Sequence, residues 1–107
     1  MTTIKPPVVW VGNFRPSWGS EHYLCRCFED AHYLVIRCQE DESTSEDVIQ
    51  LAAMFEPELV MYSRTWGLKD GDAGGFRLWE TLRRKGITSA TFTLDLPVAA
   101  PAIPADL

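Results

Sequence analysis

Two loops hold the residue types with which this chain could bind a ligand. Arg15 and Trp18 precede Gly19 in the first loop, and Arg64 and Trp66 lie in the second. Arginine presents a planar fork of donors to phosphate or carboxylate, and tryptophan stacks on a sugar or a base. Together the two pairs would suit a ligand that has negative charge and a flat apolar face. The alternative for each residue is structural: the tryptophan packs its own loop, and the arginine is solvated or ion-paired.

Four further residues could act beside these loops. Gly19, Ser20 and Glu21 open an expected helix, whose N-terminal N–H groups and partial positive charge suit phosphate or carboxylate. Glu21 could accept a hydrogen bond from a ligand hydroxyl, although the helix dipole alone favours a carboxylate in the first turn. Asp95 is expected to end the fourth strand, where it could orient a ligand hydroxyl or serve as a catalytic base. The alternative for Asp95 is an Asx turn before Pro97.

Short apolar runs separated by amphipathic stretches predict the element order β-α-β-α-β-α-β. The runs expected to form strands are 8–11, 32–38, 59–62 and 88–95. Periodic apolar residues between them predict three helices, which begin near Ser20, Ser43 and Phe76. This order is that of an α/β domain with a Rossmann-like or flavodoxin-like three-layer fold around a four-stranded parallel sheet.

The handedness of the crossover connections constrains how this sheet is arranged. We expect the strand order 2-1-3-4, with 3-2-1-4 as the alternative. In the first order, one helix covers one face of the sheet and the other two cover the opposite face. The loops 13–19 and 63–75 then open at the carboxyl ends of adjacent strands and flank one crevice. No helix is predicted after the fourth strand, so we expect an incomplete α/β domain over 1–96, with part of one sheet face uncovered, and an Ala/Pro-rich tail over 97–107.

Local patterns refine three of these elements. The apolar stripe expected to face the sheet from the first helix consists of Leu24, Cys27, Phe28 and Ala31. The segment 43–46 has the spacing of a capping box for the second helix. In the fourth strand, Ser89 and Thr91 alternate with apolar residues, which predicts one wet or weakly covered face.

Composition excludes several classes of function. The net charge of −5 argues against a nucleic-acid or anionic-membrane surface. No apolar run approaches the ~20 residues that span a bilayer. Cys25, Cys27 and Cys38 lack metal-ligand spacing and are expected to be reduced, mostly buried thiols of a cytoplasmic protein. Because the motifs GxGxxG, P-loop, HExxH and GxSxG are all absent, we expect no cofactor and no metal.

The run from Pro16 to Glu21, with the sequence P-S-W-G-S-E, is followed by an amphipathic helix and by the strand-like segment Ala31–Arg37. This series resembles the start of GT-B glycosyltransferases of the group 1 (family 4) type. Those enzymes often open with a strand, a P-x-x-G-G-x-E loop, a helix, and a strand introduced by Gly-His. The runs 57–62, 63–67 and 92–96 continue the resemblance to the end of the predicted fourth strand.

In that family the N-terminal domain mainly holds the acceptor, and a second Rossmann-like domain binds most of the nucleotide-sugar. The resemblance implies a partial or truncated acceptor-side domain, with a nucleotide-sugar and a sugar acceptor as its ligands. It would place Gly19, Ser20 and Glu21 near the donor phosphates or the acceptor. The residues that would line the acceptor side are Arg15, Trp18, Arg64 and Trp66. Because one wall of a site cannot hold both reactants in near-attack geometry, we expect little or no transferase activity from this chain alone.

The alternative belongs to another class of protein. A small flavodoxin-like binding or interaction module would use its uncovered sheet face to dock a partner or a second copy of itself. A concentration-dependent dimer through the fourth strand, without any response to ligand, would favour this alternative. Weaker binding of a nucleotide-sugar after Gly19→Ala or Arg15→Ala would favour the transferase hypothesis.

Overall fold

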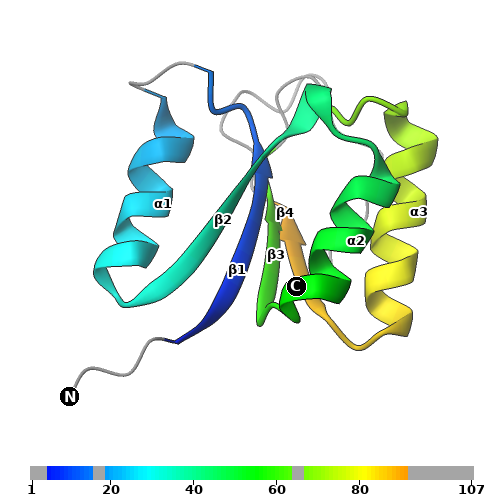
Figure 1. Cartoon of the computed structure of the whole chain (residues 1–107). Helices are drawn as coiled ribbons and strands as arrows, with labels where there is room; N and C mark the ends of the chain where they lie inside the picture. Colours follow the sequence, from blue (N-terminus) through cyan, green and yellow to red (C-terminus); the bar gives the residue numbers. More distant parts are fainter. Residues whose placement is uncertain (1–4, 16–18, 64–66, 92–107) are drawn as a thin grey trace.

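The computed structural model describes residues 5–15, 19–63 and 67–91, in which strands and helices alternate as predicted (Figure 1). The elements are β1 (Lys5–Gly12), α1 (Ser20–Asp30), β2 (Tyr33–Gln39), a 3₁₀ turn η1 (Glu40–Glu42), α2 (Ser45–Phe55), β3 (Leu59–Tyr62), α3 (Gly71–Arg84) and β4 (Thr88–Thr91).

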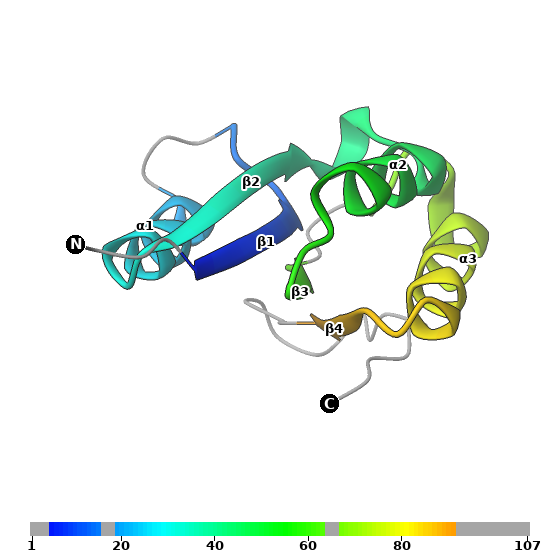
Figure 2. The same ribbon diagram turned by 60° about the horizontal axis from the view of Figure 1, so that its bottom comes forward.

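The strands form one parallel sheet in the order β2-β1-β3-β4, which confirms the predicted order 2-1-3-4 and excludes 3-2-1-4. The central strand β1 aligns Val9 with Ile36 of β2 and with Val60 of β3, and Val60 aligns in turn with Ser89 of β4. Helix α1 lies on one side of the sheet, and α2 and α3 lie on the other (Figures 1 and 2). The fold class is therefore α/β, a Rossmann-like arrangement of three layers.

The larger core lies between the sheet and the helices α2 and α3. Val9 and Val11 of β1 and Val60 and Tyr62 of β3 point into it and are fully buried. The helix residues buried against them are Val48, Ala52, Leu78, Trp79 and Leu82. Alternate residues of the central strands thus supply this core, as the period of a β-strand requires.

The smaller core lies under α1 and confirms half of the predicted apolar stripe, since Leu24 and Phe28 pack against it, whereas Ala31 is exposed at the end of the helix. Trp10 of β1 packs edge-on against Phe28, with 5.7 Å between the ring centroids, and Cys25 is fully buried beside it. Cys27, by contrast, is exposed. Glu21 and Cys25 lie one turn apart on the buried side of α1, so the helix is rotated away from the orientation that apolar residues alone would give.

Two helix starts also differ from the sequence-based expectation. The capping box of α2 joins Thr44 to Asp47, one residue later than predicted, because the Ser43 hydroxyl donates to the carbonyl of Gln39 instead. Helix α3 begins at Gly71, five residues before the predicted start at Phe76, so the preceding loop is shorter than expected.

The polar side of β4 is covered, contrary to the prediction of a wet face. Ser89 is fully buried on the side of the sheet that α3 covers, since it aligns with Val60 of the larger core. Within the described part of the chain, the Ser89 hydroxyl has no hydrogen-bond partner. The remainder of the predicted fourth strand, 92–95, lies outside the described residues.

Ser89→Ala is expected to stabilise the protein by about 1 kcal/mol, because it removes a buried hydroxyl that no partner satisfies. Urea denaturation followed by circular dichroism measures the change. Ser45→Ala is the matched control: Ser45 is equally buried, but its hydroxyl donates to Asp70 at 2.6 Å, so the same substitution should destabilise. A loss of stability in Ser89→Ala would show that its hydroxyl is bonded.

None of the helices in the described residues is long and apolar enough to span a bilayer.

Candidate functional site

The carboxyl ends of β1, β2 and β3 meet at one edge of the sheet, which is where parallel α/β folds place ligands. Four of the residues predicted to bind a ligand are described, and all four belong to the loop and helix that follow β1: Arg15, Gly19, Ser20 and Glu21. The other predicted site residues, Trp18, Arg64, Trp66 and Asp95, lie outside the described residues, so their roles stay predictions.

Glu21 is a buried carboxylate of this edge, with 5% of its surface exposed. It sits in the first turn of α1. Its Oε2 accepts long hydrogen bonds, at 3.4 Å each, from the Ser63 hydroxyl and from the main-chain N–H of Asn13. In the described part of the chain no lysine or arginine forms an ion pair with it. The carboxylate is thus positioned by two weak neutral donors.

Gly12 makes this arrangement possible. A Cβ atom at position 12 would lie 2.5 Å from the Ser63 hydroxyl oxygen and 3.0 Å from Cγ of Glu21. Ser63 in turn accepts a 2.8 Å hydrogen bond from the indole N–H of Trp10. The missing side chain therefore lets α1 and the end of β3 approach β1 closely.

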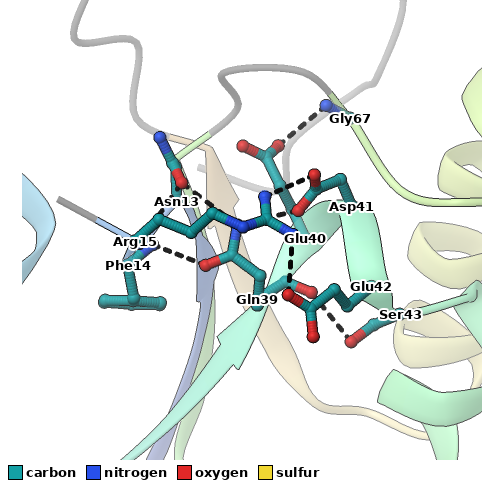
Figure 3. Close-up of polar contacts among 9 residues, drawn as sticks. All are labelled: Asn13, Phe14, Arg15, Gln39, Glu40, Asp41, Glu42, Ser43 and Gly67. Carbon is teal, nitrogen blue, oxygen red and sulfur yellow. Dashed lines mark hydrogen bonds and ion pairs between the residues drawn. The ribbon is translucent and has the colours of Figure 1, made fainter.

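Arg15 directs its guanidinium group to the turn that follows β2. It forms ion pairs with Asp41 and, at 2.6 Å, with Glu42, both in the turn that follows β2 (Figure 3). The hydrogen bond to Asp41 raises the pKa of Arg15, and the charge of Glu42 acts in the same direction. An ion-paired arginine was the structural alternative for this residue. A ligand-binding role for Arg15 stays a prediction, and a ligand anion would have to compete with two carboxylates.

Gln39 joins the loop after β1 to the end of β2, a role that the sequence did not suggest. Its side-chain oxygen accepts from the N–H of Phe14 at 2.8 Å. Its amide nitrogen donates to Asn13 at 3.0 Å and to Asp41 at 2.8 Å (Figure 3). The hydrogen bond from Gln39 to Asp41, together with the hydrogen bond from Arg15, lowers the pKa of Asp41. These contacts hold Asn13 and Phe14 against the end of β2.

Two more residues of the edge, Glu40 and His22, were not predicted to take part in a site. Glu40 is fully buried, and its Oε1 accepts a 2.8 Å hydrogen bond from the N–H of Gly67, so it anchors the chain that follows β3 (Figure 3). His22 places Nε2 at 2.7 Å from the carbonyl oxygen of Phe14. Because a carbonyl only accepts, Nε2 must carry the proton. In the sequence, Glu40 is only one residue of an acidic loop and His22 is only a histidine on the surface of a helix, so neither pattern predicts these contacts.

The described edge is acidic overall. It carries the carboxylates of Glu21, Glu40, Asp41 and Glu42, and the one arginine among these described residues is already ion-paired. Carboxylates accept hydrogen bonds and donate none when ionised, so such an edge favours ligand hydroxyls over ligand phosphates. No group of three or more His, Cys, Asp or Glu side chains in the described residues could hold a metal ion.

The fold and this edge together define a Rossmann-like α/β protein with a polar, acidic carboxyl edge. No protein-family model matches the chain, and no curated protein is similar enough to count as a relative.

Proposed function

We propose that the carboxyl edge binds the hydroxyl groups of a sugar acceptor, and that the chain is the acceptor-side part of an enzyme that transfers a sugar from a nucleotide-sugar donor. The observation that carries this proposal is Glu21, a buried carboxylate at the edge that is held by long hydrogen bonds and by no cation among the described residues. A hydroxyl from a ligand gives such a carboxylate a stronger, charge-assisted donor.

The charge of the edge supports a proposal in which the two substrates bind at different places. Because Glu21, Asp41 and Glu42 lie here and Arg15 is ion-paired, a donor diphosphate would meet repulsion, whereas a neutral acceptor would not. The donor would then be held mainly by a second domain, as the resemblance implies. A chain that binds only the acceptor does not orient both reactants, so the chain alone should show little or no sugar-transfer activity.

Glu21→Gln is expected to weaken the binding of a neutral glycoside by about tenfold or more, since a hydrogen bond to a charged group contributes about 1.5–3 kcal/mol. Methyl glucoside, methyl galactoside and methyl mannoside are titrated separately and followed by two-dimensional NMR of the amide and indole N–H groups. The signals of Gly12, Asn13 and the Trp10 indole should shift, because these groups contact Glu21 or its partner Ser63.

Glu58→Gln is the matched control. Glu58 is exposed and lies immediately before β3, at the amino edge of the sheet, so this variant should bind the glycosides as the unmodified chain does. Absence of any shift at the carboxyl edge with all three glycosides would contradict the proposal. So would tighter binding of uridine diphosphate glucose at this edge, which would assign the edge to the donor.

A second candidate, an interaction module, is favoured by a separate observation. A cavity of about 320 Å³ lies at the other end of the sheet, lined by Val8, Phe28, Tyr33, Glu58, Leu59 and Thr88. The cavity opens on the face of the sheet that α1 covers, and among the described helices only α1 lies on that face (Figure 2). The affinity for a partner that binds here should not change in Glu21→Gln, and this difference separates the two candidate functions.

A further inference from the structure

Strand β2 forms one edge of the sheet. Its inner side pairs with β1 at Tyr33 and from Val35 to Gln39, with a shift of register between these two parts, and no strand of the described residues pairs with its outer side (Figure 2). An edge strand presents main-chain N–H and C=O groups that can pair with another chain. At seven residues, β2 offers about 23 Å of such edge, at about 3.3 Å per residue.

This edge has few of the features that usually protect edge strands. It has no proline, and no bulge interrupts its pairing between Val35 and Gln39. Its single charged residue, Arg37, donates two hydrogen bonds to Glu29 of the same chain, at 2.9 and 3.0 Å, so the charge is balanced. Leu34 is 50% exposed. The opposite edge strand, β4, is described over only four residues, of which three are Ser or Thr.

We propose that β2 pairs antiparallel with β2 of a second copy of this chain, which joins two sheets into one. The pairing that uses the whole strand puts Ile36, the middle residue, on the two-fold axis opposite its own copy. Leu34 then lies opposite Cys38 of the second copy, and Val35 lies opposite Arg37 of the second copy.

The strand is self-complementary in this register. A two-fold interface requires that one surface fit its own copy, and like charges directly opposite each other would oppose pairing. Because Arg37 is off the axis and faces Val35, no like charges lie directly opposite each other, while Ile36 and Leu34 face apolar or weakly polar partners. An unrelated extended peptide would form the same main-chain bonds, but nothing in β2 selects it.

Leu34→Lys tests the proposal, because lysine on an edge strand disfavours pairing. Sedimentation equilibrium is measured from low micromolar to near-millimolar protein. The unmodified chain should form a dimer, and Leu34→Lys should weaken it by about tenfold or more. Phe76→Lys is the control: it exchanges another exposed apolar residue for lysine, on α3, which packs against β4 at the far edge. This variant should dimerise normally.

Hydrogen exchange of the unmodified chain gives a readout that needs no variant. Raising the protein concentration should slow the exchange of amides in 33–39 and leave those of α3 unchanged. A monomer at every concentration would overturn the proposal. A dimer that Phe76→Lys weakens and Leu34→Lys does not would also overturn it, and would place the interface on another surface. Slowed exchange on addition of an unrelated β-forming peptide, without self-association, would show that β2 takes a peptide instead of a copy.

Discussion

Gly12→Ala is expected to destabilise the protein by about 1–3 kcal/mol, although it adds a single methyl group, because the site has no room for it. The new Cβ would lie 2.5 Å from the Ser63 oxygen, and main-chain atoms of β1 and β3 are fixed by the sheet. Ser63 must move, and the Trp10 indole then loses its hydrogen bond. Urea denaturation gives the change in free energy of unfolding, and the Trp10 indole signal in NMR reports the lost bond.

A double-mutant cycle with Ser63→Ala tests the cause. Removing the Ser63 hydroxyl takes away the closest contact of the new methyl group, so Gly12→Ala should cost less in that background. The contact with Cγ of Glu21 at 3.0 Å remains, so the recovery should be partial. A stability change below about 0.5 kcal/mol in Gly12→Ala alone would mean that the three segments do not approach as described.

Gly74→Ala should also destabilise, by about 1–3 kcal/mol, although replacing glycine by alanine inside a helix usually stabilises by about 0.5–1 kcal/mol. A Cβ at Gly74 would fall on the carboxylate of Asp70, which receives hydrogen bonds from the N–H of Ser45 at 3.0 Å and from its hydroxyl at 2.6 Å. The carboxylate would have to leave Ser45, and the start of α2 would lose its contact with the start of α3.

The sign of this effect should reverse when Asp70 is removed. In an Asp70→Ala background the clash is absent, so Gly74→Ala should stabilise as in an ordinary helix. Denaturation of the four proteins of the cycle measures both signs. If Gly74→Ala stabilises the unmodified chain, the contact between Asp70 and Ser45 does not constrain position 74.

The same contact predicts how stability depends on pH. Burial raises the pKa of Asp70, but hydrogen bonds from Ser45 and the charge of Arg77 outweigh it, so the pKa lies below its ordinary value. A carboxyl group whose pKa is lower in the folded state stabilises the fold above its unfolded pKa, and this contribution is lost as the pH falls through the folded value. Gly74→Ala should therefore lose less stability than the unmodified chain between neutral and acidic pH.

The sequence predicted the order of the elements and the strand order because both depend on local patterns. Short apolar runs such as Val8–Val11 identify strands, and the handedness of crossovers then leaves few arrangements. The start of α3 was missed since the glycines in 71–75 are typical of loops. On α1, the packing of Leu24 and Phe28 was predicted, whereas the burial of Glu21 was missed since it is polar and contacts Ser63, which no local pattern connects to it.

The candidate site was predicted in part. Its place at the edge after β1 followed from topology, and Glu21 was identified by its position in a first helical turn. The ion pairs of Arg15 with Asp41 and Glu42 could not be predicted, because they depend on the directions of loop side chains, which the order of the strands does not determine. For the same reason the hydrogen bond between buried Glu40 and the N–H of Gly67 could not be predicted, since the sequence shows only an acidic segment there.

The polar contacts of the edge also have a kinetic consequence. Trp10 and Ser63 are 53 residues apart in the chain, and Glu40 and Gly67 are 27 apart. Contacts between such distant residues must first overcome the entropy of closing long loops, and they form only after the strands that carry them are aligned. We therefore expect the candidate site to be assembled late in folding. Changes that loosen its contacts should act mainly by speeding unfolding and leave the rate of folding almost unaltered.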